Sequence, residues 1–68
     1  PMSDIDQLIL PDTVRQVLVE NSFFTIQSVA NVSAEDLAER TGLSAEDAAL
    51  AHRASEAFLR VQKAAPVA

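Results

Sequence analysis

The sequence predicts an all-α protein, a compact bundle of about five short helices, and three observations indicate this class. The hydrophobic content is 49%, with one glycine and three prolines in 68 residues, a composition too apolar for a disordered chain and more typical of helices than of sheet. The tetrapeptide Ser-Ala-Glu-Asp begins at Ser33 and again at Ser44, and each copy is typical of a helix start. Apolar residues near the C-terminus recur at intervals of three and four, as on one face of a helix.

The helices are expected to form one domain over residues 4–63, because 68 residues are too few for two hydrophobic cores. Pro1 precedes Met2, so residues 1–3 are interpreted as an expression remnant and a disordered start. The Ala/Pro-rich residues 64–68 are interpreted as a disordered tail or the start of a linker to further protein.

The first two helices are predicted over residues 4–8 and 11–20. Ser3 is expected to cap the first. Pro11 suits the start of the second, because proline has no amide to leave unpaired in a first turn. Asn21 is expected to end this helix, since asparagine tolerates left-handed backbone better than most residues.

The next two helices are identified by their caps. Thr25 is expected to cap residues 26–30, and Ser33 to cap a helix that ends near residue 40. A hairpin at residues 41–43, which contains Gly42, then leads to the second Ser-Ala-Glu-Asp motif. In both copies the aspartate (Asp36 or Asp47) is expected to bond back to the amide of the cap residue.

The last helix is the longest and is predicted over residues 45–63. One stripe at helical spacing is expected to face the core. This stripe comprises Leu50, Ala54, Ala57, Phe58 and Val61. The large core side chains are expected to be Phe23 or Phe24, Phe58, Leu8, Leu10, Val17, Leu18, Ile26, Val29, Leu37, Leu43 and Leu50.

Several segments share their order and spacing with a known family. They are residues 17–20 (Val-Leu-Val-Glu), 22–26 (Ser-Phe-Phe-Thr-Ile), 29–30 (Val-Ala), 34–37 (Ala-Glu-Asp-Leu) and 42–44 (Gly-Leu-Ser). In this order they resemble the tandem helix-hairpin-helix modules, of the SAM-like kind, in the C-terminal acidic repeats of the NusA transcription elongation factor. Similar patterns occur in the N-terminal domains of RecA-like recombinases and in the C-terminal domain of the bacterial RNA polymerase α subunit. The resemblance implies a tandem helix-hairpin-helix fold and a partner in transcription or recombination machinery. Ser22 stands where this family usually has glycine.

The charge distribution favours a protein partner. The net charge is −5, and nine of the ten carboxylates precede Ala48, so the body of the molecule repels nucleic-acid backbones and attracts basic surfaces. We therefore expect a non-catalytic adaptor or assembly module of a larger protein, whose partner has a basic surface. The expected contact residues, here called the acidic front, are Glu35, Glu39, Glu46 and Asp47.

Weak DNA or RNA binding is the second hypothesis. A nucleic-acid-binding hairpin of this family would aim backbone amides at a phosphate from Gly42, Leu43 and Ser44. Glu46 and Asp47 oppose this use, because they occupy the favourable end of the helix dipole. The cations that would assist are Arg53, Arg60 and Lys63. A solvated face with Glu56 as the partner of Arg53 and Arg60 is the favoured interpretation of these cations, because no aromatic side chain is interleaved for base stacking.

Self-association is the third hypothesis. Phe23 and Phe24 are adjacent, so both rings cannot point fully inward from one short loop. One of them, assigned here to Phe23, is a candidate exposed anchor for a partner. Burial of both rings at different depths is the favoured alternative.

No catalytic group, cofactor site or metal site is predicted. His52 is the only histidine and there is no cysteine, so neither a thiol dyad nor a recognisable metal site is expected. His52 is expected on the surface or rim of the last helix. Charges interrupt every apolar run, which predicts no membrane span, and the cytoplasm is the default location.

Overall fold

The computed structural model describes the backbone of residues 4–64 and the side chains of residues 5–61. All regular structure in this range is helical, which confirms the predicted all-α class. The elements are a 3-10 helix η1 (Asp4–Gln7) and the α-helices α1 (Asp12–Glu20), α2 (Ile26–Ala30), α3 (Ala34–Thr41) and α4 (Ala45–Ala64). The predicted Ser3 cap, the start at residues 1–3 and residues 65–68 of the predicted tail lie outside the described residues, whereas residue 64 is still helical.

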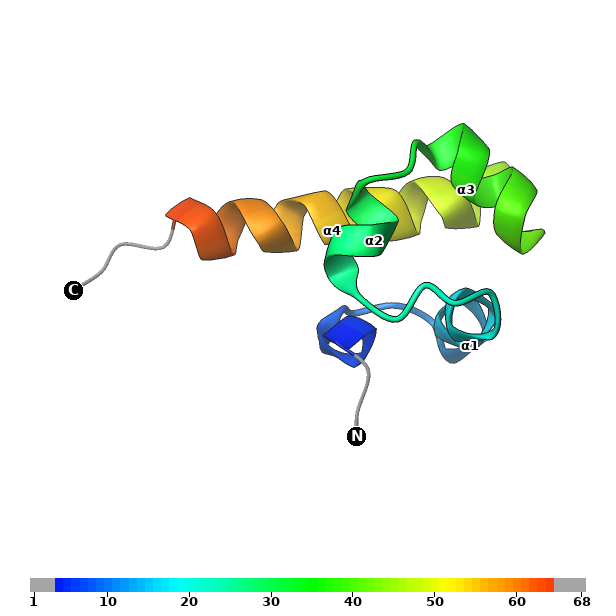
Figure 1. The fold of residues 1–68 in the computed structure, drawn as a ribbon, viewed down its shortest axis with the longest axis horizontal. Helices are drawn as coiled ribbons and strands as arrows, with labels where there is room; N and C mark the ends of the chain where they lie inside the picture. Colours follow the sequence, from blue (N-terminus) through cyan, green and yellow to red (C-terminus); the bar gives the residue numbers. More distant parts are fainter. Residues whose placement is uncertain (1–3, 65–68) are drawn as a thin grey trace.

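Helix α4 runs along most of the molecule, and the shorter helices gather on it (Figure 1). Both α2 and α3 pack directly against α4. Helix α3 lies beside the N-terminal half of α4, while α2 crosses near its middle and leads back to α1 and η1 (Figure 1). The bundle is therefore built around one long helix.

The first element is a 3-10 helix of four residues, not the predicted α-helix over residues 4–8. The amide of Leu8 donates to the carbonyl of Ile5 at 3.1 Å, the i to i+3 pattern of the tighter helix. Ile5 is fully buried, and its amide donates to the carbonyl of Phe24 at 3.4 Å. This short turn therefore connects the N-terminal segment to the α1–α2 connection.

Helix α1 begins at Asp12, one residue later than expected, with Pro11 as its cap residue. It buries Val14 and Leu18 and ends at Asn21. The expected left-handed residue is not Asn21, whose φ is −103°, but Ser22, whose φ is +70°. Asn21 ends the helix in another way, since its side-chain amide donates to the carbonyl of Val17 at 2.8 Å.

Three of the four predicted hydroxyl caps, all but that of Ser3, are confirmed. Thr25 accepts from the amide of Ser28 at 3.1 Å, Ser33 from Asp36 at 3.2 Å, and Ser44 from Asp47 at 3.1 Å. Within residues 5–61 neither aspartate carboxylate bonds back to the amide of its cap residue, so the predicted capping boxes are only half formed.

The core is apolar and lies between α4 and the shorter helices. Its buried residues are Ile5, Leu8, Leu10, Val14, Leu18, Phe23, Ile26, Val29, Leu37, Ala48 and Ala51. Helix α4 contributes its small residues, including the fully buried Ser55. Val17, Leu43 and Phe58, which were predicted in the core, are half-buried.

The predicted buried face of α4 is wrong for much of its length. Leu50 is 44% exposed, Val61 is 68% exposed, and Ala57 is also exposed. Helix α4 presents its small face, with Ala48, Ala51 and Ser55, to the core. Small residues allow α2 and α3 to approach closely. Of the predicted stripe, only Ala54 and Phe58 are half-buried and pack against the core.

Candidate docking surface

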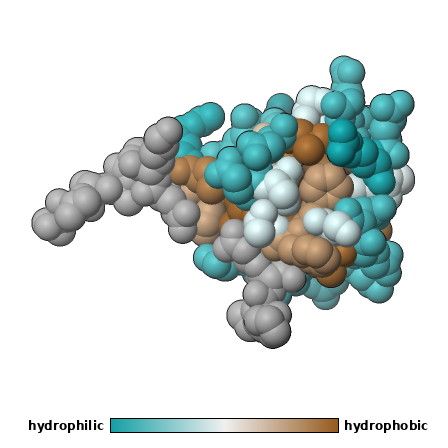
Figure 2. Space-filling model, in the orientation of Figure 1, coloured by the Kyte–Doolittle hydropathy of each residue, from teal (hydrophilic) through white to brown (hydrophobic). Residues whose placement is uncertain are grey.

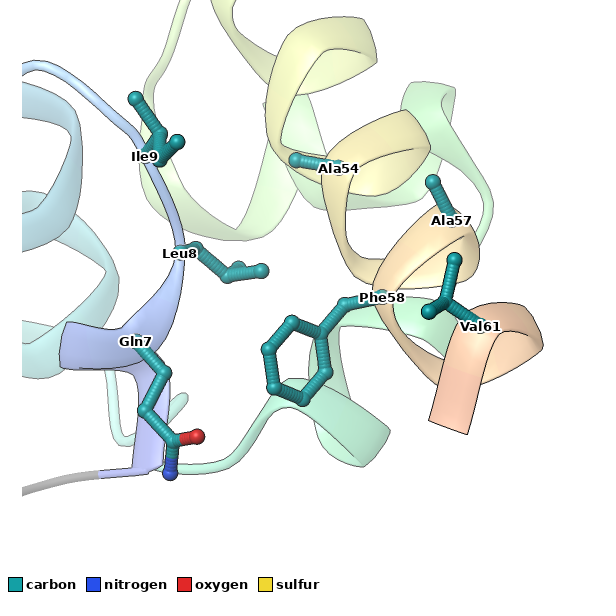
Figure 3. Close-up of a pocket in the computed structure, with 7 residues that line it drawn as sticks. All are labelled: Gln7, Leu8, Ile9, Ala54, Ala57, Phe58 and Val61. Carbon is teal, nitrogen blue, oxygen red and sulfur yellow. The ribbon is translucent and has the colours of Figure 1, made fainter. Parts of the chain in front are cut away.

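An open apolar groove lies between the η1–α1 connection and the C-terminal half of α4. Its volume is about 450 Å³, and it is lined by Gln7, Leu8, Ile9, Ala54, Ala57, Phe58 and Val61. The side chain of Leu8 and the ring of Phe58 point toward one another across it (Figure 3). Ala57 and Val61 lie along its α4 side, while Gln7 and Ile9 lie on the opposite side (Figure 3).

The rims of this groove are strongly exposed apolar side chains. Ile9 is 96% exposed and Val61 68%. Leu50 lies four residues before Ala54 and so continues the α4 side of the groove by one helical turn. Scattered surface leucines are ordinary, but several large apolar groups gathered along one groove are typical of an interaction surface.

Apolar side chains also reach the surface elsewhere. On the face drawn in Figure 2, brown patches interrupt the hydrophilic surface. Phe24 is 49% exposed, but it does not line the groove.

The rings of Phe23 and Phe24 are placed differently from the anchor prediction. Phe23 is only 9% exposed and belongs to the core, so it is not a surface anchor. Phe24 presents about half of its surface to solvent, and its carbonyl binds the amide of Ile5. The favoured expectation that both rings are buried is therefore wrong, and the outward ring is Phe24, not Phe23.

The acidic front lies at one end of the molecule. Glu35 and Glu39 are exposed on α3, Glu46 is exposed in the first turn of α4, and Asp47 beside it is half-buried. The hairpin after α3 brings these two helix segments to the same end (Figure 1). None of the four carboxylates forms an ion pair within residues 5–61.

The hairpin itself uses its polar groups internally. Gly42 is left-handed, with φ of +80°, and its amide donates to the carbonyl of Ala38 at 2.8 Å. Leu43 is half-buried against the core, and the hydroxyl of Ser44 caps α4. Through these contacts Gly42 forms the C-cap of α3 and Ser44 forms the N-cap of α4.

The cations predicted for nucleic acid lie on α4. Arg53 and Arg60 are exposed, and neither forms an ion pair among the described side chains. The predicted partner Glu56 instead contacts His52, with 3.3 Å between Oε1 and Nε2, so the predicted pairing with the arginines is wrong. Lys63 lies in α4, but its side chain is outside the described residues.

No arrangement within residues 5–61 indicates catalysis by metal. The described histidine, aspartate and glutamate side chains include no group of three placed to share a metal ion. His52 is half-buried, as expected of a rim residue, and its Nδ1 has no partner. In the described part of the chain, no helix combines the length and the apolar character of a membrane span.

The sequence interpretation assigned Ile9 to the first helix and did not predict that it lines a groove. A signal for it exists in the run Leu8-Ile9-Leu10 before Pro11. The amide of Leu10 donates to the carbonyl of Leu8 at 3.1 Å, so Ile9 is the central residue of a tight turn. Leu8 and Leu10 on either side of it are buried, whereas Ile9 is exposed.

No family model, no curated protein and no solved structure matches this chain.

Proposed function

We propose that this chain is a non-catalytic protein-interaction module that docks a partner through the groove between Ile9 and α4. The observation that carries the proposal is the exposure of Ile9 and Val61 on the two sides of one apolar groove. Covering these side chains would remove apolar surface from water, at about 25 cal/mol per Å² buried. Neither side chain belongs to the buried core or to the partly buried residues packed against it.

The same proposal includes a tandem helix-hairpin-helix arrangement, with α1–α2 and α3–α4 as its two units. The two connections support it, because each has one left-handed residue, Ser22 or Gly42. In each connection this residue is followed by an apolar residue packed in or against the core, Phe23 or Leu43. A hydroxyl cap, Thr25 or Ser44, then begins the next helix.

In this proposal the acidic front orients the partner protein as it approaches. Its unpaired carboxylates attract basic protein surfaces over about 10 Å at 0.1 M salt, and such attraction changes association rates more than affinity. The interaction partner is therefore expected to associate more slowly as salt rises.

Position-specific photo-crosslinking tests the proposal. A photoreactive residue is placed at Val61 in one sample and at Glu20, an exposed position on α1, in the matched control. Each is irradiated in extract of the cells that express the protein. Protease-sensitive crosslinks from position 61 and none from position 20 are expected. Nuclease-sensitive crosslinks, or no position dependence, would contradict a protein-docking role for the groove.

A further inference from the structure

We infer that the groove receives an amphipathic α-helix whose apolar stripe is flanked by acidic residues. This inference rests on the proposed docking function and specifies the chemistry of its partner. Its basis is the combination of an open apolar groove along α4 with two exposed arginines that lie beside the α4 side of this groove.

The shape of the groove fits a helix. One side is the straight C-terminal half of α4, where Ala54, Ala57 and Val61 follow each other at intervals of three and four residues. Two of these residues are alanines, so a second helix axis can approach at the short end of the usual 8–10 Å range. Ile9 on the opposite side is exposed and can contact the flank of a helix that lies along α4. Docking of an amphipathic helix into such a groove is a recurring mode of recognition.

Two cations lie beside the α4 side of the groove, although the molecule as a whole is acidic. Arg53 lies four residues before Ala57, and Arg60 three residues after it. Both arginines therefore share the α4 surface beside the groove. Both are exposed and lack an ion pair in the described part of the chain. Arg60 also borders a second, more polar hollow with Gln27 and Glu56.

These two cations select the partner's charge. A helix in the groove would place its flanking side chains beside Arg53 and Arg60, where carboxylates gain favourable interactions and ammonium groups are repelled. A second copy of α4 fits less well as the occupant. If Leu50 of the second copy lies against Val61 of the first, Arg53 and Arg60 of both copies lie along the same contact and repel one another. The complementary partner is thus another protein with an acidic amphipathic helix.

Two synthetic peptides provide the test. Both are about five helical turns long and share one leucine/alanine stripe, but the residues that flank the stripe are glutamate in one and lysine in the other. Each is titrated into isotope-labelled full chain at low and at physiological salt, and backbone chemical shifts are recorded. We expect the glutamate peptide to shift residues around Ile9, Ala57 and Val61 and to bind about tenfold more tightly than the lysine peptide.

Variants separate the apolar and the charged contributions. The double change Arg53→Glu and Arg60→Glu is expected to reverse the preference between the peptides. Val61→Gln is expected to weaken both peptides, while Phe24→Gln, at an exposed apolar residue outside the groove, is expected to leave both affinities unchanged.

Three results would overturn the inference. One is equal affinity of the groove for the two peptides. This result would contradict the acidic character of the partner but not the docking function of the groove. Another is no saturable binding of the glutamate peptide. The third is concentration-dependent dimerisation in light scattering that Val61→Gln abolishes, which would make a second copy the occupant. Failure of the docking function itself is seen separately, as absence of protein crosslinks from position 61.

Discussion

Among residues 4–64, two adopt left-handed backbone, Ser22 at φ +70° and Gly42 at φ +80°. The sequence places glycine at only one of them. Gly42 was expected in a turn and is the C-cap of α3. Residue type favours the neighbouring Asn21 over Ser22, although the resemblance places Ser22 where the family usually has glycine. In the structure the amides of Ser22 and Phe23 donate to the carbonyls of Val19 and Leu18, the pattern of a helix end with its left-handed residue at Ser22.

Ser22→Gly is expected to stabilise the protein. A left-handed conformation costs a residue with a Cβ atom about 1 kcal/mol, and glycine avoids this cost. Part of the gain is lost to the greater freedom of glycine in the unfolded chain, so the free energy of unfolding should rise by about 0.5 kcal/mol. Urea denaturation measures it. The converse control, Gly42→Ala, should lower stability by about 1 kcal/mol, since no atom lies within 4 Å of an added Cβ and strain alone acts there. A loss of stability in Ser22→Gly would contradict the assigned backbone conformation.

Ser55→Ala is expected to stabilise the protein as well. The hydroxyl of Ser55 is fully buried and has no hydrogen-bond partner. On folding it therefore loses its hydrogen bonds to water without gaining others, and alanine avoids this free-energy cost. Alanine also has the higher helix propensity. We expect the free energy of unfolding to rise by about 1 kcal/mol. A decrease would show that the hydroxyl is bonded in solution.

At the scale of elements, the caps and the order of helices were predictable, whereas the orientation of α4 was not. Hydroxyl caps are local features, so Thr25, Ser33 and Ser44 could be identified from sequence. The stripe from Leu50 to Val61 is a real apolar stripe, but α4 has a second apolar face, formed by Ala48, Ala51 and Ser55 with their small side chains. Hydropathy alone predicts that the stripe with the larger side chains faces the core. The face with the small side chains is buried instead, because α2 and α3 pack closely against it.

The orientation of α4 can be tested with two leucines. Leu37→Ala removes a fully buried side chain and is expected to cost about 2 to 5 kcal/mol of stability. Leu50→Ala removes a half-exposed one and should cost less than about 1 kcal/mol. The comparison uses the same chemical change and the same denaturation experiment. Similar losses for both variants would place the Leu50 stripe in the core after all.

At the scale of the whole molecule, charge and apolar surface are separated. The acidic front occupies the α3 end, and the groove with its arginine rim lies along the other half of α4. The acidic front was predictable from charge counting. The groove was not, since it joins Ile9 to residues some fifty positions later, and this pairing depends on the tertiary fold.

Nucleic acid is expected to bind poorly to this molecule. Ser44 and Gly42 already use their polar groups as caps, and Glu46 stands exposed beside them. Fluorescence anisotropy with labelled single-stranded and duplex oligonucleotides should show no saturable binding even at low salt, the condition that favours electrostatic contacts most. The double variant Glu46→Gln and Asp47→Gln is the informative comparison, because a gain of binding there would identify these carboxylates as the barrier. Saturable binding by the unaltered chain would favour the nucleic-acid hypothesis.

The most direct test of the account is the stability of the double variant Ile9→Gln and Val61→Gln, measured together with its affinity for the glutamate-flanked peptide. If the groove is a docking surface that the fold does not need, the free energy of unfolding stays within about 0.5 kcal/mol of the original value while peptide binding is lost. A loss of several kcal/mol would show that these side chains belong to the core, and unchanged peptide affinity would show that the groove is not the docking site.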